Sequence, residues 1–212
     1  MDNVLLIVKE LRRHSTKQPV VGFKDPFKVL ISTVLSQRTR DENTEKASRQ
    51  LFVKYPNAKA LAHAQLGSIK KLIKPAGFYR VKAKRIKKIS LELLEKFSGK
   101  VPRKKEDLLQ LNGVGPKTAA CVIVYGFKKP DLPVDTHVFR ISHRLAIAKS
   151  KTPEQTESEL KKFFPKKYWI EINHLMVQFG QKICLPRNPR CEICGLKKIC
   201  AYYKIVVMEK RN

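Results

Sequence analysis

The stretch Leu111-Asn112-Gly113-Val114-Gly115-Pro116-Lys117-Thr118 lies between two segments whose apolar residues recur every three or four positions. That spacing is typical of amphipathic helices, so we expect a tight hairpin between two helices, together spanning about 105–127. The glycines allow a sharp turn and expose backbone N–H groups, and the proline suits the first turn of the second helix. Free N–H groups at a helix start can hold an anion such as a phosphate. The alternative is an ordinary corner between two packed helices.

The same helical periodicity extends along the chain on both sides of the hairpin, and no segment shows sustained alternation of apolar and polar residues. We therefore predict an all-α fold with short connections. Asp25-Pro26 and Thr152-Pro153 each combine a capping side chain with a proline suited to the first helical turn. The expected helices cover residues 4–11, 26–36, 41–54, 58–63, 68–74, 80–97, 105–111, 116–127, 136–148, 152–163 and 168–183.

The chain is strongly basic, with a net charge of +27 over 212 residues. A folded protein this basic most often binds a polyanion, and nucleic acid is the first expectation. An acidic membrane surface, or the lysine enrichment of heat-stable proteins, would also fit the composition. No apolar run reaches the roughly 18 residues of a transmembrane helix, and no secretory leader is recognisable. We expect an intracellular protein, in the cytoplasm or nucleoid if its source is prokaryotic.

Four cysteines lie close together near the end of the chain, at Cys184, Cys191, Cys194 and Cys200, with the spacing C-x6-C-x2-C-x5-C. Disulfides are rare inside cells, so this group is interpreted as a metal site. Four thiolates suit either one tetrahedral zinc ion or a [4Fe-4S] cluster, and the spacing by itself leaves both open. The fifth cysteine, Cys121, lies in an apolar run and is expected to be an inert core thiol.

A second short motif, Val134-Asp135-Thr136-His137, follows the hairpin. An aspartate before a helix is usually only its N-cap. However, a Gly-rich hairpin followed by lysine, a V-D-T-H string and a terminal group of four cysteines occur in this order in one family. From about Asp25 to Cys200 the chain resembles the endonuclease III family of helix-hairpin-helix DNA glycosylases.

The resemblance implies two helical lobes. Residues 19–130 would form one lobe, in which Leu111, Gly113, Val114 and Gly115 belong to a DNA-binding hairpin. Residues 1–18 and 131–212 would form the other, and its four cysteines would hold a [4Fe-4S] cluster in the loop 184–200. The two lobes would enclose a cleft where Lys117 and Asp135 meet.

The resemblance also implies an activity, that of a bifunctional DNA glycosylase and AP lyase of base excision repair. Such an enzyme removes oxidised or ring-saturated pyrimidines, for example thymine glycol, and nicks the strand by β-elimination. Lys117 would be the nucleophile that forms a Schiff base, although most lysines are merely solvated. Asp135 would deprotonate Lys117 or stabilise positive charge at C1′. The expected partner is double-stranded DNA with damaged bases or abasic sites, bound by a monomer.

The family extrudes the damaged base and fills the gap with a glutamine of an L-S-x-Q-x-x-D segment. Here the segment Leu35–Asp41 places Arg38 at the glutamine position and Gln37 before it, so either is a candidate wedge. Both could instead touch only phosphate. The segment from Gly77 to Ala83 resembles the one that carries a second wedge in the family, which would make Phe78 that wedge. The alternative is that Phe78 is a buried core residue. Arg187, in the proline-stiffened segment between the first two clustered cysteines, is a candidate phosphate contact.

Three other functions fit parts of this pattern. Mismatch uracil or thymine glycosylases and adenine glycosylases resemble the chain, but they lack a lysine at position 117. The adenine enzymes also carry a glutamate before the wedge, where this chain has Ser32-Thr33-Val34-Leu35. A non-catalytic, redox-sensing DNA-binding protein would keep the cysteines and the hairpin without needing Lys117 and Asp135 together.

Overall fold

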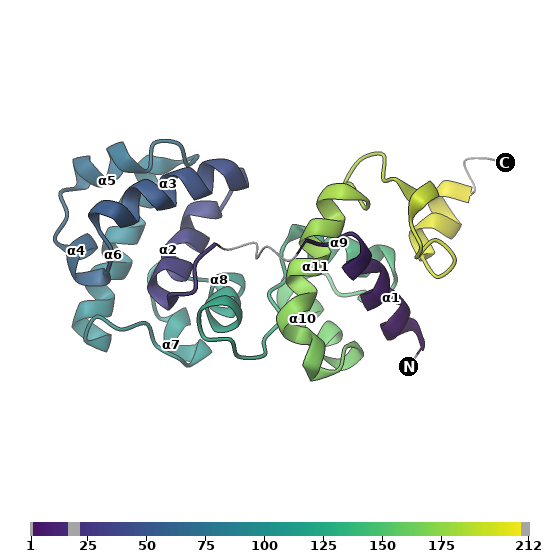
Figure 1. Ribbon diagram of the computed structural model, residues 1–212. Helices are drawn as coiled ribbons and strands as arrows, with labels where there is room; N and C mark the ends of the chain where they lie inside the picture. The colour runs from purple at the N-terminus through teal and green to yellow at the C-terminus, as the bar shows by residue number, and fades with distance from the viewer. Residues whose placement is uncertain (1, 17–21, 209–212) are drawn as a thin grey trace. The chain divides into compact units, whose positions relative to one another are not determined.

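Helices make up all the regular structure of residues 2–16 and 22–208, the part of the chain that the computed structural model describes (Figure 1). No strand occurs among these residues, and the all-α prediction is confirmed. The chain forms two compact units, one of Val21–Asp131 and one of Met1–Val20 with Leu132–Asn212. The boundary expected between residues 18 and 19 lies outside the described residues.

Helix α2, Pro26–Ser36, is the central helix of the Val21–Asp131 unit. It begins where the sequence predicts, because the Asp25 side chain accepts a hydrogen bond from the Lys28 backbone N–H at 2.9 Å. Its residues are buried along almost the whole length, so the helix is enclosed by neighbours rather than amphipathic. Those neighbours include α3 (Asp41–Lys54), α6 (Tyr79–Phe97) and α8 (Pro116–Cys121).

The remaining helices of this unit complete one apolar core. Helices α4 (Ala58–Ala62) and α5 (Leu66–Leu72) pack on α6, and α7 (Lys105–Leu109) packs on α8. Cys121 is buried in this core, as expected of an inert thiol. The expectation of one α-helix over 116–127 is wrong in its second half, because Val122–Gly126 continues α8 as a π-helix.

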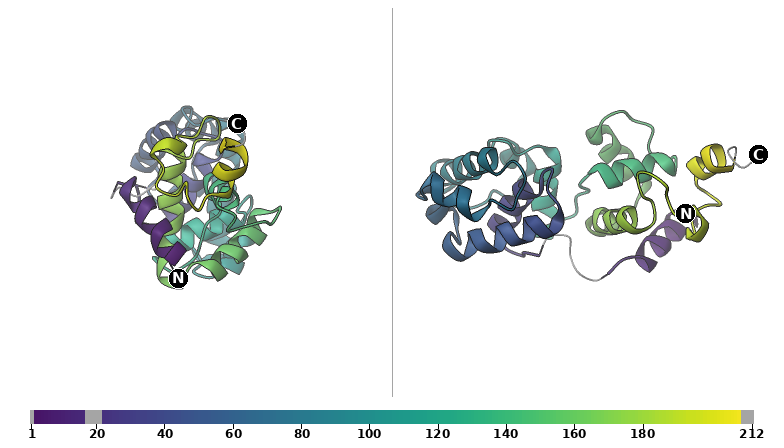
Figure 2. Two further views of the ribbon diagram at one scale, coloured as in Figure 1. Left: turned by 90° about the vertical axis from the view of Figure 1, so that its right-hand side faces the viewer. Right: turned by 90° about the horizontal axis from the view of Figure 1, so that it is seen from above.

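The other unit has its own core around α11, Trp169–Lys182. Helices α1 (Asp2–Arg13) and α9 (Thr136–Arg144) pack against α11, and α10 (Pro153–Phe163) packs against α9. Figure 2 shows α1 beside α11 from two further directions. Arg12 of α1 grips Glu171 of α11 with two hydrogen bonds of 2.6 and 3.2 Å, which joins the two sequence segments of this unit.

A loop follows α11 and carries the four clustered cysteines. It contains a single 3-10 turn, Cys191–Ile193, and leads into a π-helix at Tyr203–Met208. No pattern in the sequence predicts this last helix, and residues 209–212 of the tail lie outside the described part. None of the described helices combines the length and apolar character needed to cross a membrane.

Candidate functional site

The hairpin between α7 and α8 is anchored by its apolar residues and turned by its first glycine. Leu111 and Val114 are 2% and 5% exposed and belong to the core, so their side chains fix the hairpin in place. Gly113 has φ +72, a left-handed conformation that favours glycine. Gly115 precedes α8 and no side chain caps the helix there. An added Cβ on Gly115 would meet nothing within 4 Å, so this backbone is open to a close approach.

Lys117 lies in the first turn of α8, two residues after the open backbone of Gly115. It is the second residue of α8, after Pro116, and its side chain is partly exposed. The N–H groups of a helix's first turn carry partial positive charge and have no partner within the helix. A primary amine therefore stands next to a backbone that suits a phosphate.

Asp135 is the N-cap of α9, and its carboxylate is held in one orientation. Oδ1 accepts hydrogen bonds from the backbone N–H groups of His137 and Val138, both at 2.9 Å. The buried Asn173 donates from Nδ2 to the carbonyl of Pro133 at 2.9 Å and lies 3.5 Å from Oδ2 of Asp135. The capping interpretation of Asp135 is correct, and capping uses only one of the two carboxylate oxygens.

The α2–α3 loop distinguishes the two candidate wedges. The side chain of Gln37 is held within the protein, because its Oε1 accepts a 2.8 Å hydrogen bond from Nη1 of Arg85. Arg38 is exposed, and its φ of +51 places the backbone in the left-handed region. A non-glycine residue held in that region is uncommon and strained, which is frequent at functional loops. The exposed candidate of the pair is Arg38.

Phe78 stands at the start of α6 with a φ of +58 and an exposed fraction of 62%. The alternative that it is a core phenylalanine is therefore wrong. Large aromatic side chains are normally buried, so one displayed at a strained helix start is available for stacking.

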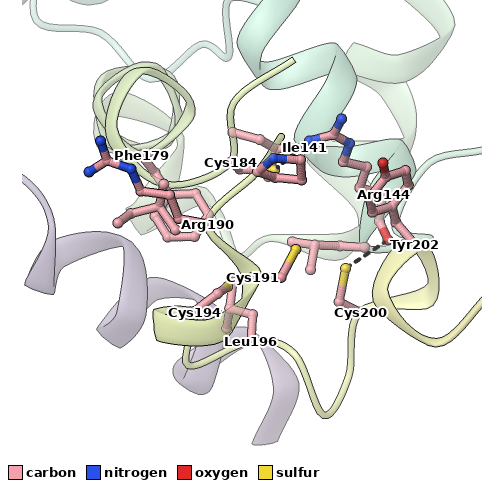
Figure 3. A pocket seen from close by; sticks show the side chains of 13 residues that line it. Ile141, Arg144, Phe179, Cys184, Arg190, Cys191, Cys194, Leu196, Cys200 and Tyr202 are labelled. Carbon is pink, nitrogen blue, oxygen red and sulfur yellow. Dashed lines mark hydrogen bonds between the residues drawn. The ribbon is translucent and has the colours of Figure 1, made fainter. Parts of the chain in front are cut away.

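All four clustered cysteines line one cavity of the unit that contains α11 (Figure 3). Arg144 and Tyr202 stand on one side of it, with the guanidinium 4.3 Å from the ring centroid, and Phe179 and Arg190 stand on the other. Within the described residues, no three His, Cys, Asp or Glu side chains are placed to hold a single metal ion. The thiols thus surround a common space without converging on one point.

The cavity is apolar enough to disfavour free thiolates. Burial raises the pKa of Cys191 and Cys200, and raises the pKa of Cys194 to about 11. The charge of Arg144 opposes this in part, because it lowers the pKa of Cys191 and of Cys200. Nη1 of Arg144 also donates to Sγ of Cys184 at 3.3 Å. Thiolates in such surroundings are stabilised mainly by what they coordinate.

The loop around the cysteines is braced from two helices. Arg144 of α9 donates to the carbonyls of Leu185 and Pro186 at 2.7 and 3.0 Å. Glu10 of α1, only 6% exposed, accepts a 2.8 Å hydrogen bond from the N–H of Gly195. Arg187 is exposed in the braced segment, as a phosphate contact would need to be.

Several residues with specific contacts were not singled out from the sequence. Asn173, Arg144 and Glu10 act through partners distant in the chain, and no local pattern marks them. Lys82 did leave a signal, because it occupies a buried position of the α6 stripe that continues with Ile86 and Leu93. A lysine at a core position of an amphipathic helix indicates a specific partner.

A helical unit with a glycine hairpin, a following lysine and a basic surface defines a DNA-binding protein of the helix-hairpin-helix class. Residues 31–166 match the family described as HhH-GPD superfamily base excision DNA repair protein. The chain belongs to this superfamily and, within it, to the endonuclease III family.

Individual relatives agree with this assignment. Endonuclease III of Thermotoga maritima is 54% identical over 200 residues, which cover 93% of this chain and 94% of that protein. A trapped covalent endonuclease III–DNA intermediate has a TM-score of 0.89 and 31% identity, covering 98% of this chain and 96% of its own. A thermostable thymine-DNA glycosylase has a TM-score of 0.83 and 28% identity, covering 95% and 94%.

Proposed function

We propose that this protein excises oxidised or ring-saturated pyrimidines, such as thymine glycol, from double-stranded DNA and cleaves the strand through a Schiff base on Lys117. Membership of the endonuclease III family makes the protein a DNA glycosylase and AP lyase of base excision repair. The observation that carries the proposed chemistry is the position of Lys117, partly exposed on the first turn of α8 behind the hairpin. A relative with 31% identity has been trapped as a covalent intermediate on DNA.

The reaction begins with the neutral amine of Lys117, because a protonated lysine has no lone pair. The amine attacks C1′ of the damaged nucleotide, and the base departs with the electrons of the glycosidic bond and takes up a proton. Opening of the sugar ring gives a Schiff base between Nζ and C1′. This cation acidifies the C2′ proton, whose removal expels the 3′ phosphate by β-elimination. Hydrolysis then frees the lysine.

Asp135 would supply the negative charge that these reaction steps need. One carboxylate oxygen is engaged by the first turn of α9, so the group cannot rotate freely. The other oxygen would stabilise positive charge developing at C1′, or accept the proton of the attacking amine. A fixed carboxylate does this without reorganising at the moment of reaction, which is the main advantage of a preorganised site.

Base removal requires the damaged nucleotide to leave the helix stack, at a cost of a few kcal/mol. We assign the role of duplex wedge to Arg38, since Gln37 is bonded to Arg85 while Arg38 is exposed. Phe78 would stack beside the base that has lost its partner. The N–H groups of Gly113 and Gly115, together with Arg187, would contact phosphates.

The four cysteines would hold a [4Fe-4S] cluster. The donor set fits, because four thiols line one apolar cavity and four thiolates are the usual ligands of such a cluster. Cys184, Cys191, Cys194 and Cys200 would hold the cluster, which would supply cross-links within the loop and a partner for its buried thiolates, and the bond-breaking steps would belong to Lys117 and Asp135. A broad absorption band near ~400 nm in purified protein would distinguish the cluster from colourless zinc.

Borohydride trapping tests the proposed chemistry directly. Incubated with duplexes that each carry a different lesion, the protein should form a covalent DNA adduct, strongest on ring-saturated pyrimidines. Lys117→Gln should form none while still binding DNA, and Lys88→Gln, which removes an exposed lysine of α6, should behave as the unmodified protein. Specific binding without an adduct on any lesion, with the cluster present, would overturn the lyase assignment and favour a non-catalytic DNA-binding protein.

The similarity to a thymine-DNA glycosylase raises one further candidate, removal of thymine or uracil opposite guanine. The same panel decides between the two. Release of mispaired thymine without any trapped adduct would favour this second activity, whereas an adduct that disappears in Lys117→Gln supports the first.

A further inference from the structure

Lys82 is a buried cation that ties helix α6 to the α2–α3 loop. Its side chain lies in α6, is 3% exposed, and donates from Nζ to the carbonyl of Leu35 and to Oγ1 of Thr39, both at 2.6 Å. Leu35 and Thr39 stand on either side of the exposed Arg38. A single ammonium group therefore fixes both ends of the turn that carries Arg38.

Arg85, one turn further along α6, reaches the same loop and also the hairpin. Its Nη1 donates to Oε1 of Gln37 at 2.8 Å. Its side chain also lies over the hairpin, since a Cβ added to Gly113 would come within 2.5 Å of Nε and 2.6 Å of Cδ of Arg85. The glycine thus gives Arg85 room to pass between the hairpin and the α2–α3 loop.

The segment carrying Phe78 meets the same loop. A Cβ on Gly77 would lie 3.1 Å from the carbonyl oxygen of Arg38, so Gly77 packs directly on the turn that Lys82 holds. The Thr39 hydroxyl that accepts from Lys82 also lies 3.3 Å from the carbonyl of Gln37, within donating distance. Three segments that bear candidate DNA contacts are therefore joined within the Val21–Asp131 unit by two neighbouring cations of α6.

Folding alone does not explain a charge at this place. Lys82 is the one charged residue on the buried face of α6, whose other members are Ala83, Ile86, Ile89, Ser90 and Leu93. An aliphatic side chain would pack there without the cost of burying an ammonium group. Burial, reinforced by the charge of Arg85, lowers the pKa of Lys82 to about 8. A buried charge that is retained despite its cost commonly secures one arrangement of its partners.

We propose that Lys82 and Arg85 are positioning residues for base extrusion. They hold Arg38, Phe78 and the hairpin at fixed spacing, so that the three segments enter and grip the duplex as one preorganised surface. Ordering the loops in advance removes an entropy cost from the step that unstacks the damaged base. The inference rests on the proposed function, since it assigns roles within the same DNA interface.

The test compares a step that needs base extrusion with one that does not. Lys82→Met and Arg85→Met would be measured against Lys88→Met, an exposed lysine of the same helix. One duplex carries a ring-saturated pyrimidine beside a 2-aminopurine reporter of unstacking, and the other carries a preformed abasic site. In the two positioning variants we expect single-turnover base release to fall on the order of 10- to 100-fold, with a matching loss of the fluorescence rise. Borohydride trapping on the abasic duplex should stay within about threefold of the unmodified protein.

Thr39 provides a second variant that does not depend on the folding of a mutated core. Thr39→Val removes one of the two acceptors of Lys82 at nearly constant shape and should reproduce part of the loss of base release. Thr39→Ser keeps the hydroxyl and should release bases at close to the rate of the unmodified protein. Equal loss on both duplexes, or no loss on either, would overturn the inference. Failure of the proposed function would look different, because the unmodified protein would then give no trapped adduct at all.

Discussion

Asp135 caps helix α9 and is also proposed to act in the chemistry, and the two roles can be separated. Asparagine caps helices about as well as aspartate, so Asp135→Asn should keep both N–H contacts and change the free energy of unfolding by less than about 1 kcal/mol. The lost negative charge should slow base release by on the order of 10²- to 10⁴-fold. Single-turnover excision assays and denaturant titration measure the two effects.

Asp25 is a matched control for this substitution. It caps α2 through the same kind of contact, at 2.9 Å to the N–H of Lys28, and has no proposed part in the chemistry. Asp25→Asn should leave both stability and rate close to those of the unmodified protein. A fall in rate that simply follows a fall in stability in Asp135→Asn would assign Asp135 to capping alone.

The lowered pKa of Lys82 makes a prediction about the pH dependence of stability. Its pKa falls from the usual 10.5 to about 8 because the group is buried, and the neighbouring charge of Arg85 adds to the effect. Between these two values the unfolded chain binds a proton that the native protein has released, so stability from this residue rises with pH. Below pH 8 both states are protonated and the contribution is constant.

Comparison with Lys82→Met isolates this contribution. The free energy of unfolding of the unmodified protein, relative to the variant, should rise between pH 8 and 10.5, by at most about 1.4 kcal/mol per pH unit. Urea titrations at several pH values provide the measurement, with Lys88→Met as the exposed control that should show a flat difference. A flat difference for Lys82→Met as well would mean that the ammonium group is solvated.

At the scale of elements, substitutions of the two hairpin glycines separate an effect on backbone conformation from an effect on DNA contact. Gly113→Ala should destabilise the protein by about 1–3 kcal/mol, because alanine is strained at φ +72 and its Cβ would displace Arg85. Gly115→Ala has no such strain and open space around the new Cβ, so it should cost less than about 1 kcal/mol. Both should weaken DNA binding, measured by titration with an abasic-site analogue. Unchanged binding by Gly115→Ala would remove this backbone from the interface.

Helices were predictable from sequence where local chemistry defines their ends. Asp25 and Pro26 fix the start of α2, and Gly99, with φ +76, follows the end of α6. The π-helix at Val122–Gly126 was not predictable, because apolar periodicity over a few residues does not separate it from a continuing α-helix. The same limit applies to the π-helix at Tyr203–Met208.

The residues of the candidate site likewise fall into those that local sequence predicts and those that only tertiary structure reveals. The hairpin, Lys117, Asp135 and the cysteines are contiguous motifs and could be located from sequence. The bonds of Lys82 and Arg85 join residues more than 40 positions apart, and only tertiary packing brings those residues together. The sequence could not decide between Gln37 and Arg38 as the wedge for this reason, since the observation that separates them is the bond from Arg85.

At the scale of the whole molecule, each of the two units has its own apolar core, and all four clustered cysteines belong to one of them. Loss of the proposed cluster should therefore weaken the unit built around α11 more than the unit built around α2. Cys194→Ser should bleach the ~400 nm absorption and reduce amide hydrogen-exchange protection in α1, α9 and α11. Protection in α2 and α6 should persist.

Cys121→Ser is the reciprocal control, because Cys121 lies in the core of the other unit, 2% exposed. A hydroxyl in that apolar position should cost about 1–3 kcal/mol and lower protection in α2, while the absorption band stays unchanged. The cluster would then act by holding the loop against α1 and α9, where Glu10 and Arg144 already brace it. If Cys194→Ser lowered protection equally in both units, the effect of the cysteines would extend beyond the unit that contains them, and a role confined to bracing the loop would be wrong.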